Sequence, residues 1–213
     1  IADRWWWPWL VILIGMAMTG GFAYLVGRPI LRLKGNYLAM ATLGLGIIIY
    51  ILGGQFKAIT GGYDGLTGIP RLHIGGFKLW PPRRYYFLVW SAAIAVIVIA
   101  TNLVNSRIGR ALRAIHTGEV AANTCGVDTE RYKIQALVIS AMCASLAGSL
   151  YAHFQGTVSP NPFNFGASVE LVVMAAVGGL SSIWGAPLGV GVVFAIRDLI
   201  RSRMEDILHV RGG

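Results

Sequence analysis

Long apolar windows dominate the hydrophobic pattern of this chain. Windows without any Asp, Glu, Lys or Arg occupy residues 5–27, 35–56, 85–106, 134–169 and 171–196. A helix rises about 1.5 Å per residue, so about 22 residues span roughly 33 Å, enough to cross the ~30 Å hydrocarbon core of a bilayer. Buried helices of soluble proteins are usually shorter and keep a polar face. The pattern therefore predicts an all-α, polytopic transmembrane helical bundle.

The fourth window is longer than one crossing needs, and we place its crossing at 134–153. Small residues recur there at every fourth position, at Ser140, Ala144, Gly148 and Ala152. They share one face of a helix and let a second helix approach closely, which favours association in lipid. The sequence predicts tight helix packing through this face, without identifying the partner.

The last window is interrupted near its middle by residues that favour turns. These are Gly178, Gly179, Ser181, Ser182, Gly185 and Pro187. Two half-length helices, at 169–178 and 186–197, fit this segment better than one continuous helix, because broken helices are tolerated where they line a cavity or are covered by protein. The sequence thus predicts about four full crossings plus a broken or re-entrant helix pair.

Basic residues between the windows orient the chain. The linker after the first window carries Arg28 and Arg32 and no acid, so the positive-inside rule places it in the cytoplasm. The Gly- and Pro-rich loop 57–84 then lies outside and indicates turns, and 105–133 lies inside. For the tail at 197–213 two arrangements remain. The count of Lys and Arg favours one broken crossing, whereas the GGLSS break favours a re-entrant pair.

Composition agrees with the membrane assignment. The chain is 55% hydrophobic and 13% charged, against roughly 25% charged in soluble domains. A net charge of +9 would suggest nucleic acid in a soluble protein. Here the basic residues lie beside the apolar windows, where they meet anionic lipid headgroups. We therefore expect the lipid bilayer, and no nucleic acid, as a partner.

The sequence contains no recognisable catalytic, metal-binding or cofactor-binding motif. It has no HExxH, no GxSxG and no GxxxxGK[ST] phosphate loop, so we expect no enzymatic activity, no cofactor and no ATP hydrolysis by this chain. Glu170 is the only acid between residues 131 and 197. We interpret it as a favourable charge in the first turn of the half-helix rather than as a functional carboxylate.

The longest stretch of mixed charge, 105–133, predicts a cytoplasmic loop that contains a short amphipathic helix. Its apolar residues Ile108, Ala111, Leu112 and Ile115 recur at helical spacing. An ordinary solvated loop stabilised by charge pairs is the alternative interpretation.

Five blocks of this sequence resemble the permease family of branched-chain amino-acid ABC importers, specifically LivM-type subunits. They are RLKGNYLAMATLGLG at 32–46, TGGYDGLTGIP at 60–70, GRALRAI at 109–115, VSPNPFNF at 158–165 and VVMAAVGGLSSIWGAPLG at 172–189. The blocks follow the family's order and cover nearly the whole chain. In two respects the chain departs from the family. Many relatives have a Glu where Ile47 stands, and relatives extend beyond both ends, so we expect 1–213 to be a fragment of a single transmembrane permease domain.

The resemblance implies a permease subunit that imports branched-chain amino acids across the bacterial cytoplasmic (inner) membrane. It also implies a homologous permease subunit as heterodimer partner, two cytoplasmic ABC ATPases that hydrolyse ATP, and an extracytoplasmic substrate-binding protein. Related permeases move urea or short amides, and no residue here distinguishes those substrates. A secondary transporter is a further alternative, but it would require an intramembrane ion or proton site.

The resemblance further implies that the loop 105–133 is the coupling loop that docks on an ATPase. The residues expected there are Arg107, Gly109, Arg110, Arg113, Glu119, Ala121, Ala122 and Gly126. The last four fit a loose E-x-A-A-x-x-x-G docking motif, in which small alanines seat a helix in a cleft and Gly126 permits a sharp exit. We expect Glu119 to pair with Arg110 or Arg113 and fix the register.

The predicted break is also our candidate for the translocation pathway. Exposed carbonyl groups near Gly178 and Gly179, with Ser181 and Ser182, could receive the charged ends of a zwitterionic amino acid during alternating access.

Overall fold

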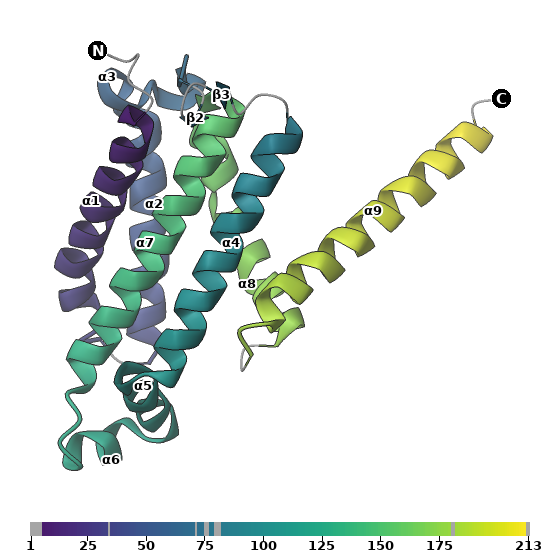
Figure 1. Ribbon diagram of the computed structural model, residues 1–213. Coiled ribbons are helices and arrows are strands. Elements are labelled where there is room, and N and C mark those ends of the chain that lie inside the picture. The colour runs from purple at the N-terminus through teal and green to yellow at the C-terminus, as the bar shows by residue number, and fades with distance from the viewer. Residues whose placement is uncertain are drawn as a thin grey trace. The chain divides into compact units, whose positions relative to one another are not determined.

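A computed structural model describes residues 6–33, 35–70, 72–74, 77–78, 82–179 and 182–211 of the chain (Figure 1). The elements in chain order are α1 (Trp7–Ile30), α2 (Asn36–Gln55), α3 (Lys57–Thr60), the 3₁₀ helix η1 (Gly62–Asp64), β1 (Leu66–Thr67), β2 (His73–Ile74), β3 (Phe77–Lys78), α4 (Pro82–Asn105), α5 (Arg107–Thr117), α6 (Glu119–Thr124), α7 (Thr129–Gln155), β4 (Thr157–Val158), η2 (Asn161–Phe163), α8 (Phe165–Gly178) and α9 (Gly185–Arg211). The chain divides into an N-terminal unit, Ile1–Asn161, and a C-terminal unit, Pro162–Gly213.

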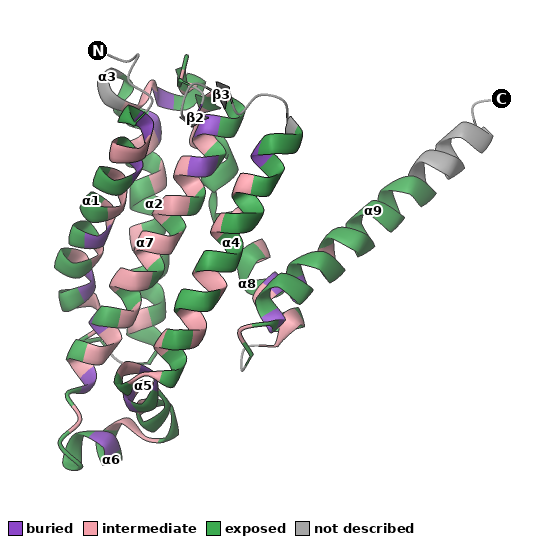
Figure 2. Ribbon diagram, viewed as in Figure 1, coloured by how far each residue is buried: buried purple, intermediate pink, exposed green. Residues whose placement is uncertain are grey.

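Four helices of the N-terminal unit are long and apolar enough to cross a membrane. They are α1, α2, α4 and α7, and they lie side by side as a bundle in Figure 1. Most of their large apolar side chains are exposed (Figure 2), as expected of helices that face lipid instead of water. Within the described residues, each of the four predicted crossings is present as one helix long and apolar enough to span a membrane.

The bundle is held together chiefly by α1 against α7, two helices far apart in the sequence. Small residues on α1 allow the contact: Gly20 leaves room for Met142, and a Cβ at Gly27 would overlap the Leu137 side chain. Beside Gly20, on the side away from Gly27, the Thr19 hydroxyl donates to Ser145 Oγ at 3.2 Å. Such close approach maximises dispersion contacts, which drive helix association in lipid.

The stripe of small residues on α7 does not make this contact. Ser140 and Ala144 are exposed, and a Cβ at Gly148 would have no atom within 4 Å. Within the described residues no helix of this chain packs on that face, so packing through it stays a prediction for a partner outside the chain. The glycines of the contact lie on α1. On α7, Met142 and Leu137 fill the space above Gly20 and Gly27, and Ser145 and Ser149 lie above Gly15.

At the other end of the bundle from α5, the loop after α2 is fixed to α7. Leu72 is 1% exposed and packs with Ile12, Tyr85 and Leu150. The Tyr85 hydroxyl donates to the Leu150 carbonyl at 2.5 Å. This bond joins α4 to α7. It also gives the Tyr85 hydroxyl a partner inside the bundle, so burying that polar group costs little free energy.

Short antiparallel strands complete the same end. β1 pairs with β4, and Gly65, at φ 77°, lies so close to β4 that a Cβ would overlap the Val158 carbonyl oxygen. The buried His153 ring bonds the Pro70 carbonyl through Nδ1 at 2.7 Å. The Gly- and Pro-rich sequence predicted turns in place of regular structure, but the described residues of this segment also form the short helices α3 and η1 and short strands.

In the C-terminal unit, α8 and α9 form an antiparallel helical hairpin. The two backbones touch at glycines: a Cβ at Gly178 would overlap the Gly185 carbonyl, and one at Gly189 would overlap the Met174 carbonyl. Gly179 ends α8 with φ 96°, which reverses the chain. The broken helix pair is confirmed, and its two helices fold back on one another rather than continue in line.

The second helix of the pair is not half-length. We expected it to end near residue 197, but α9 continues to Arg211. Its charged C-terminal half, RDLIRSRMEDILHVR, contains no Gly or Pro and is rich in good helix formers, so nothing in it stops the helix.

Glu170 has a different role from the one expected. Glu170 lies beyond the first turn of α8. The N-cap of this helix is Asn164, whose side chain accepts from the Ala167 N–H at 2.9 Å. The Glu170 carboxylate instead pairs with Arg197 of α9, Oε1 to Nη2 at 2.9 Å. Glu170 is therefore a link between the two helices of the hairpin, and the capping interpretation is wrong.

The glycine contact of the hairpin leads to a prediction about stability. Gly189→Ala should lower the thermal unfolding midpoint of the purified protein in detergent, because the added methyl group overlaps the α8 backbone, at a cost of roughly 1–3 kcal/mol. Gly191→Ala is the matched control. It has open space around it, and alanine favours helix by up to about 1 kcal/mol, so the midpoint should stay or rise. Equal midpoints for the two variants would contradict the contact.

Candidate functional site

The predicted amphipathic helix of the loop 105–133 is present as α5. Ser106 caps it, accepting from the Ile108 N–H at 3.2 Å while its hydroxyl donates to the Leu103 carbonyl of α4 at 2.6 Å. Ala111 is buried, and Leu112 and Ile115 are half-buried, whereas the arginines of the helix are exposed. The apolar face thus packs against the bundle (Figure 2), and the prediction is confirmed.

The start of α5 is pressed onto the end of α4. Gly109 is buried, and a Cβ there would overlap the Val104 carbonyl and its backbone. Arg110 Nη1 donates to the Asn105 carbonyl and Arg113 Nη2 to the Val104 carbonyl, each at 3.2 Å. These cations satisfy carbonyls that the end of a helix leaves without partners, and they favour its negative dipole end. Gly109, Arg110 and Arg113 therefore fix the angle between α4 and α5.

The proposed docking motif forms a helix of its own, α6, which the sequence did not separate from α5. Gly118 interrupts the two helices with an extended backbone. At the other end, the Val127 N–H bonds the Ala122 carbonyl and the Gly126 N–H bonds the Asn123 carbonyl, both at 3.0 Å. These two hydrogen bonds, together with Gly126 at φ 82°, form a Schellman cap. Gly126 gives the sharp exit that was predicted.

Glu119 pairs with a residue that sequence reasoning missed. Its Oε1 lies 2.7 Å from Nζ of Lys133, near the start of α7. The expected pairs with Arg110 and Arg113 do not form, since both arginines bond the end of α4 instead. The pair ties the first turn of α6 to α7, and the register of α6 is set by α7 rather than by α5.

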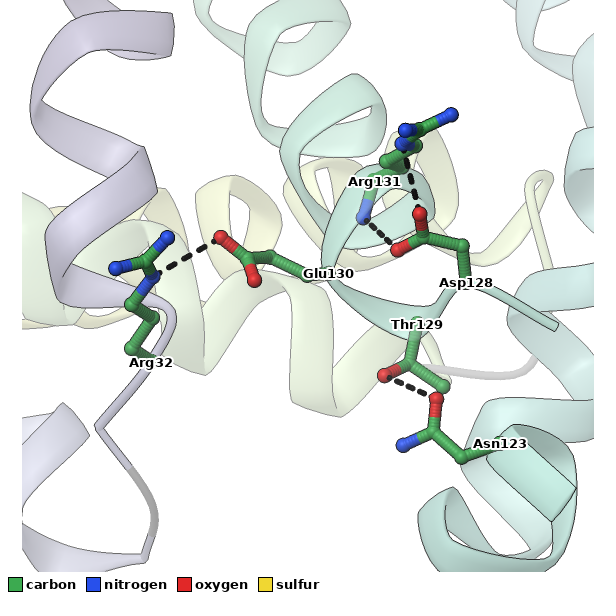
Figure 3. A network of polar contacts seen from close by, with 6 residues as sticks. All are labelled: Arg32, Asn123, Asp128, Thr129, Glu130 and Arg131. Atoms are coloured by element: carbon green, nitrogen blue, oxygen red, sulfur yellow. Dashed lines mark hydrogen bonds and ion pairs between the residues drawn. The ribbon is translucent and has the colours of Figure 1, made fainter.

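The junction between α6 and α7 is a network of polar contacts (Figure 3). Asp128 caps α7 by accepting from the Arg131 N–H at 3.1 Å, and its other oxygen lies 2.7 Å from Arg131 Nε. The buried Thr129 hydroxyl donates to Asn123 Oδ1 of α6 at 3.2 Å. Exposed ion pairs contribute only about 0–1 kcal/mol each, so the capped helix start and the Thr129 bond give the junction its geometry.

One contact of this network reaches another part of the bundle. Arg32, in the linker after α1, places Nε 3.1 Å from Glu130 Oε1 of α7 (Figure 3). The loop is thus connected to α4 by α5, to α7 by α6, and through α7 to the linker between α1 and α2.

Two apolar residues of α6 are exposed. Val120 is 76% exposed and Ala121 is exposed, whereas Ala122 is buried. Val120 occupies the unspecified position of the E-x-A-A motif, so the motif itself gave no reason to select it. Its exposure on a loop outside the spans is the signal, and only the structure provides it.

The candidate pathway residues lie in the C-terminal unit, at the turn of the α8–α9 hairpin. Gly178 is in the glycine contact with α9, and Gly179 forms the reversal. Ser182 is exposed, and its N–H donates to the Gly179 carbonyl at 3.3 Å. Ser181 lies outside the described residues. Within the described part of the chain, no group of three or more His, Cys, Asp or Glu is placed to bind a metal ion.

The contact at Gly109 can be tested by adding one methyl group. Gly109→Ala should loosen α5 from α4, because the methyl group overlaps the Val104 backbone, at a cost of roughly 1–3 kcal/mol. Limited trypsin digestion should then cleave after the loop arginines severalfold faster. Gly118→Ala is the control, since its Cβ would meet only the Ala121 Cβ at 3.6 Å in an extended backbone. Unchanged cleavage of Gly109→Ala would exclude the contact.

Comparison with known proteins places the chain in a family. The family described as "Branched-chain amino acid transport system / permease component" matches residues 1–205. The high-affinity branched-chain amino acid transport system permease protein LivM of Escherichia coli (strain K12) is 32% identical over 96% of this chain and 54% of its own length. LivH of the same organism is 31% identical over 90% of this chain and 62% of its own length. A probable LivM of Methanocaldococcus jannaschii is 24% identical over 95% of this chain and 60% of its own length.

The chain spans 54–62% of the length of these relatives. No solved structure matches it. The extent of the family match and the identity to LivM are together decisive, and the chain belongs to the branched-chain amino acid transport system permease components.

Proposed function

We propose that this chain is the membrane core of a permease subunit that imports branched-chain amino acids across the cytoplasmic membrane, driven by ATPases of an ABC system. Membership of the family and the four membrane-capable helices support this proposal. The similarity to both LivM and LivH supports a second, homologous permease as partner. Two cytoplasmic ATPases and an extracytoplasmic binding protein complete the proposed importer, and the chain itself performs no catalysis.

The observation that carries the proposal is the way α5 and α6 are fixed between α4 and α7. A loop that transmits movement must be stiff, because a flexible loop would absorb the displacement of its partner. Gly109 and the arginines attach one end to α4, and the Glu119–Lys133 pair and the Thr129 bond attach the other end to α7. A displacement of α6 by an ATPase would therefore move α4 and α7 together.

The exposed face of α6 is the proposed contact with the ATPase. Val120 and Ala121 supply a small apolar surface on an otherwise polar loop, and such surfaces form the centres of protein interfaces. Arg107 is exposed beside α4 and can meet acidic groups of the partner. Arg110, Arg113 and Ala122, also expected at the docking surface, would act by holding the loop in shape, because each already contacts the rest of the chain.

This assignment can be tested by co-purification with the ATPase subunit from membranes. Val120→Ser should weaken the association about tenfold, the size expected when a central apolar contact of about 1.4 kcal/mol is lost. His116→Ser is the control, since it changes an exposed residue of α5 and leaves α6 unaltered. Association of Val120→Ser at the level of the control would remove α6 from the interface.

The same assay separates two roles of Glu119. If Glu119 acts by holding α6 on α7, Glu119→Gln and Lys133→Gln should weaken the association equally, since either change removes the ion pair. The loss should be about two- to fivefold, as expected for a partly exposed pair. A loss with Glu119→Gln alone would show that Glu119 acts through contacts other than the pair with Lys133.

We further propose that substrate passes the turn of the α8–α9 hairpin, including Gly179, Ser181 and Ser182. Irregular backbone at membrane depth is tolerated where it lines a cavity, and Ser182 is exposed beside the non-helical Gly179. Gly178 belongs to the helix contact and would support this turn rather than line the path.

Bulk at Ser182 should obstruct that path. Ser182→Leu should reduce uptake of labelled leucine by cells severalfold, whereas the small Ser182→Ala should leave it nearly unchanged. Co-purification with the ATPase should be the same for both, which separates a blocked path from a failed assembly. Full uptake by Ser182→Leu would contradict the pathway, and uptake of urea in place of leucine would overturn the substrate assignment.

A further inference from the structure

A cavity of about 780 Å³ lies between the end of α1 and the start of α7, next to α5. This volume is within the range of about 300–1,000 Å³ that is typical of ligand sites. Its lining consists of Tyr24, Arg28, Arg32, Ile108, Asp128, Glu130, Arg131, Ile134, Gln135, Val138 and Ile139. All of these residues belong to the N-terminal unit, and none of them has a role in the proposed pathway.

The cavity has a charged part and an apolar part. Its ionised side chains come from the last turn of α1, the linker after it and the first turn of α7, where two apolar spans end. Ile134, Val138 and Ile139 continue one to two turns into α7, in the direction of the span. The charged part therefore lies at the level of lipid headgroups and the apolar part at the level of acyl chains.

The charges of the cavity leave one cation in excess. Each of its two carboxylates pairs with a different arginine: Glu130 Oε1 lies 3.1 Å from Arg32 Nε, and Asp128 Oδ2 lies 2.7 Å from Arg131 Nε. Arg28 is exposed, and no described residue forms an ion pair with it. Because these two ion pairs use only the Nε–H of Arg32 and Arg131, both guanidinium groups keep further donors at their ends.

We propose that this cavity binds one anionic phospholipid, with the phosphate on Arg28 and an acyl chain along Val138 and Ile139. Guanidinium groups bond phosphate oxygens in a forked geometry, and Tyr24, one turn before Arg28 on α1 and in the same lining, carries a hydroxyl that is a further donor. A free phosphate would satisfy Arg28 but leave the apolar wall in water. A lipid satisfies both parts, and basic pockets between spans on the cytoplasmic side suit anionic headgroups.

The position of the site gives the bound lipid a structural effect. The cavity is bounded by α1, by Ile108 of α5 and by the Asp128 cap of α7. A lipid there fills space between the α1–α7 pair and the loop that carries α6, so it stabilises the position of α5 against the bundle. The inference concerns lipid binding alone and stands whether or not α6 contacts an ATPase.

The experiment uses the full-length permease with its partner subunits, extracted in mild detergent and examined by native mass spectrometry. The wild-type complex should retain phosphatidylglycerol in preference to phosphatidylethanolamine. Arg28→Gln should reduce that retention about tenfold, as expected when a charge-assisted hydrogen bond is lost. Arg203→Gln, which removes one exposed positive charge from α9, should retain lipid as the wild type does. Equal retention by Arg28→Gln and the control would overturn the proposal, as would equal binding of phosphatidylethanolamine.

A second measurement covers the case in which Arg28→Gln assembles poorly. Phosphatidylglycerol added to delipidated complex should raise its thermal midpoint, and Arg28→Lys, which keeps the charge, should retain at least part of that shift. Val138→Asn should diminish the shift without removing the charge. A shift that inorganic phosphate reproduces at millimolar concentration would show that the apolar wall has no role, and it would overturn the assignment to a lipid.

Discussion

Backbone amides cannot be left without hydrogen-bond partners in hydrocarbon, and this constraint accounts for the arrangement of the N-terminal unit. Every segment long enough to cross is one continuous helix, so the four crossings satisfy their own backbones. Turns, short strands and capped loop helices are confined to the two ends. Their remaining polar groups bond one another or the helix ends, as the Arg113 guanidinium of α5 does with the Val104 carbonyl of α4. The irregular backbone of the loop with α5 and α6 is possible because it lies beyond the spans.

Within the bundle, glycine decides where helices meet. Lipid provides no hydrophobic force between apolar helices, so the contact with the closest approach is favoured. Gly20 and Gly27 make α1 the helix on which α7 packs, and Gly178, Gly185 and Gly189 do the same between α8 and α9. Gly109 repeats this device where the loop leaves α4. The proposed coupling surface is thus attached to the bundle by the same kind of contact that holds the bundle together.

The sequence was sufficient for features that depend on local pattern. Window length predicted the four crossings, and apolar spacing predicted α5, because both follow from the geometry of a single helix. Contacts between elements were less accessible. Glu119 and the arginines of α5 are near in sequence, but the extended Gly118 separates α6 from α5 and brings Glu119 to Lys133 of α7. The face of α7 that meets α1 was equally inaccessible, because the side chains of α1 determine which face of α7 is used within the chain.

The contact between α1 and α7 also bears on how the chain is made. Thr19 and Ser145, which bond across it, are 126 residues apart. A ribosome that adds roughly 5–20 residues per second takes about 6–25 s to synthesise that interval. During this time α1 is in the membrane without its helix partner, with the grooves at Gly20 and Gly27 open to lipid or to other proteins. The bundle can close only when α7 arrives, so its assembly depends on the pace of translation and on whatever protects α1 until then.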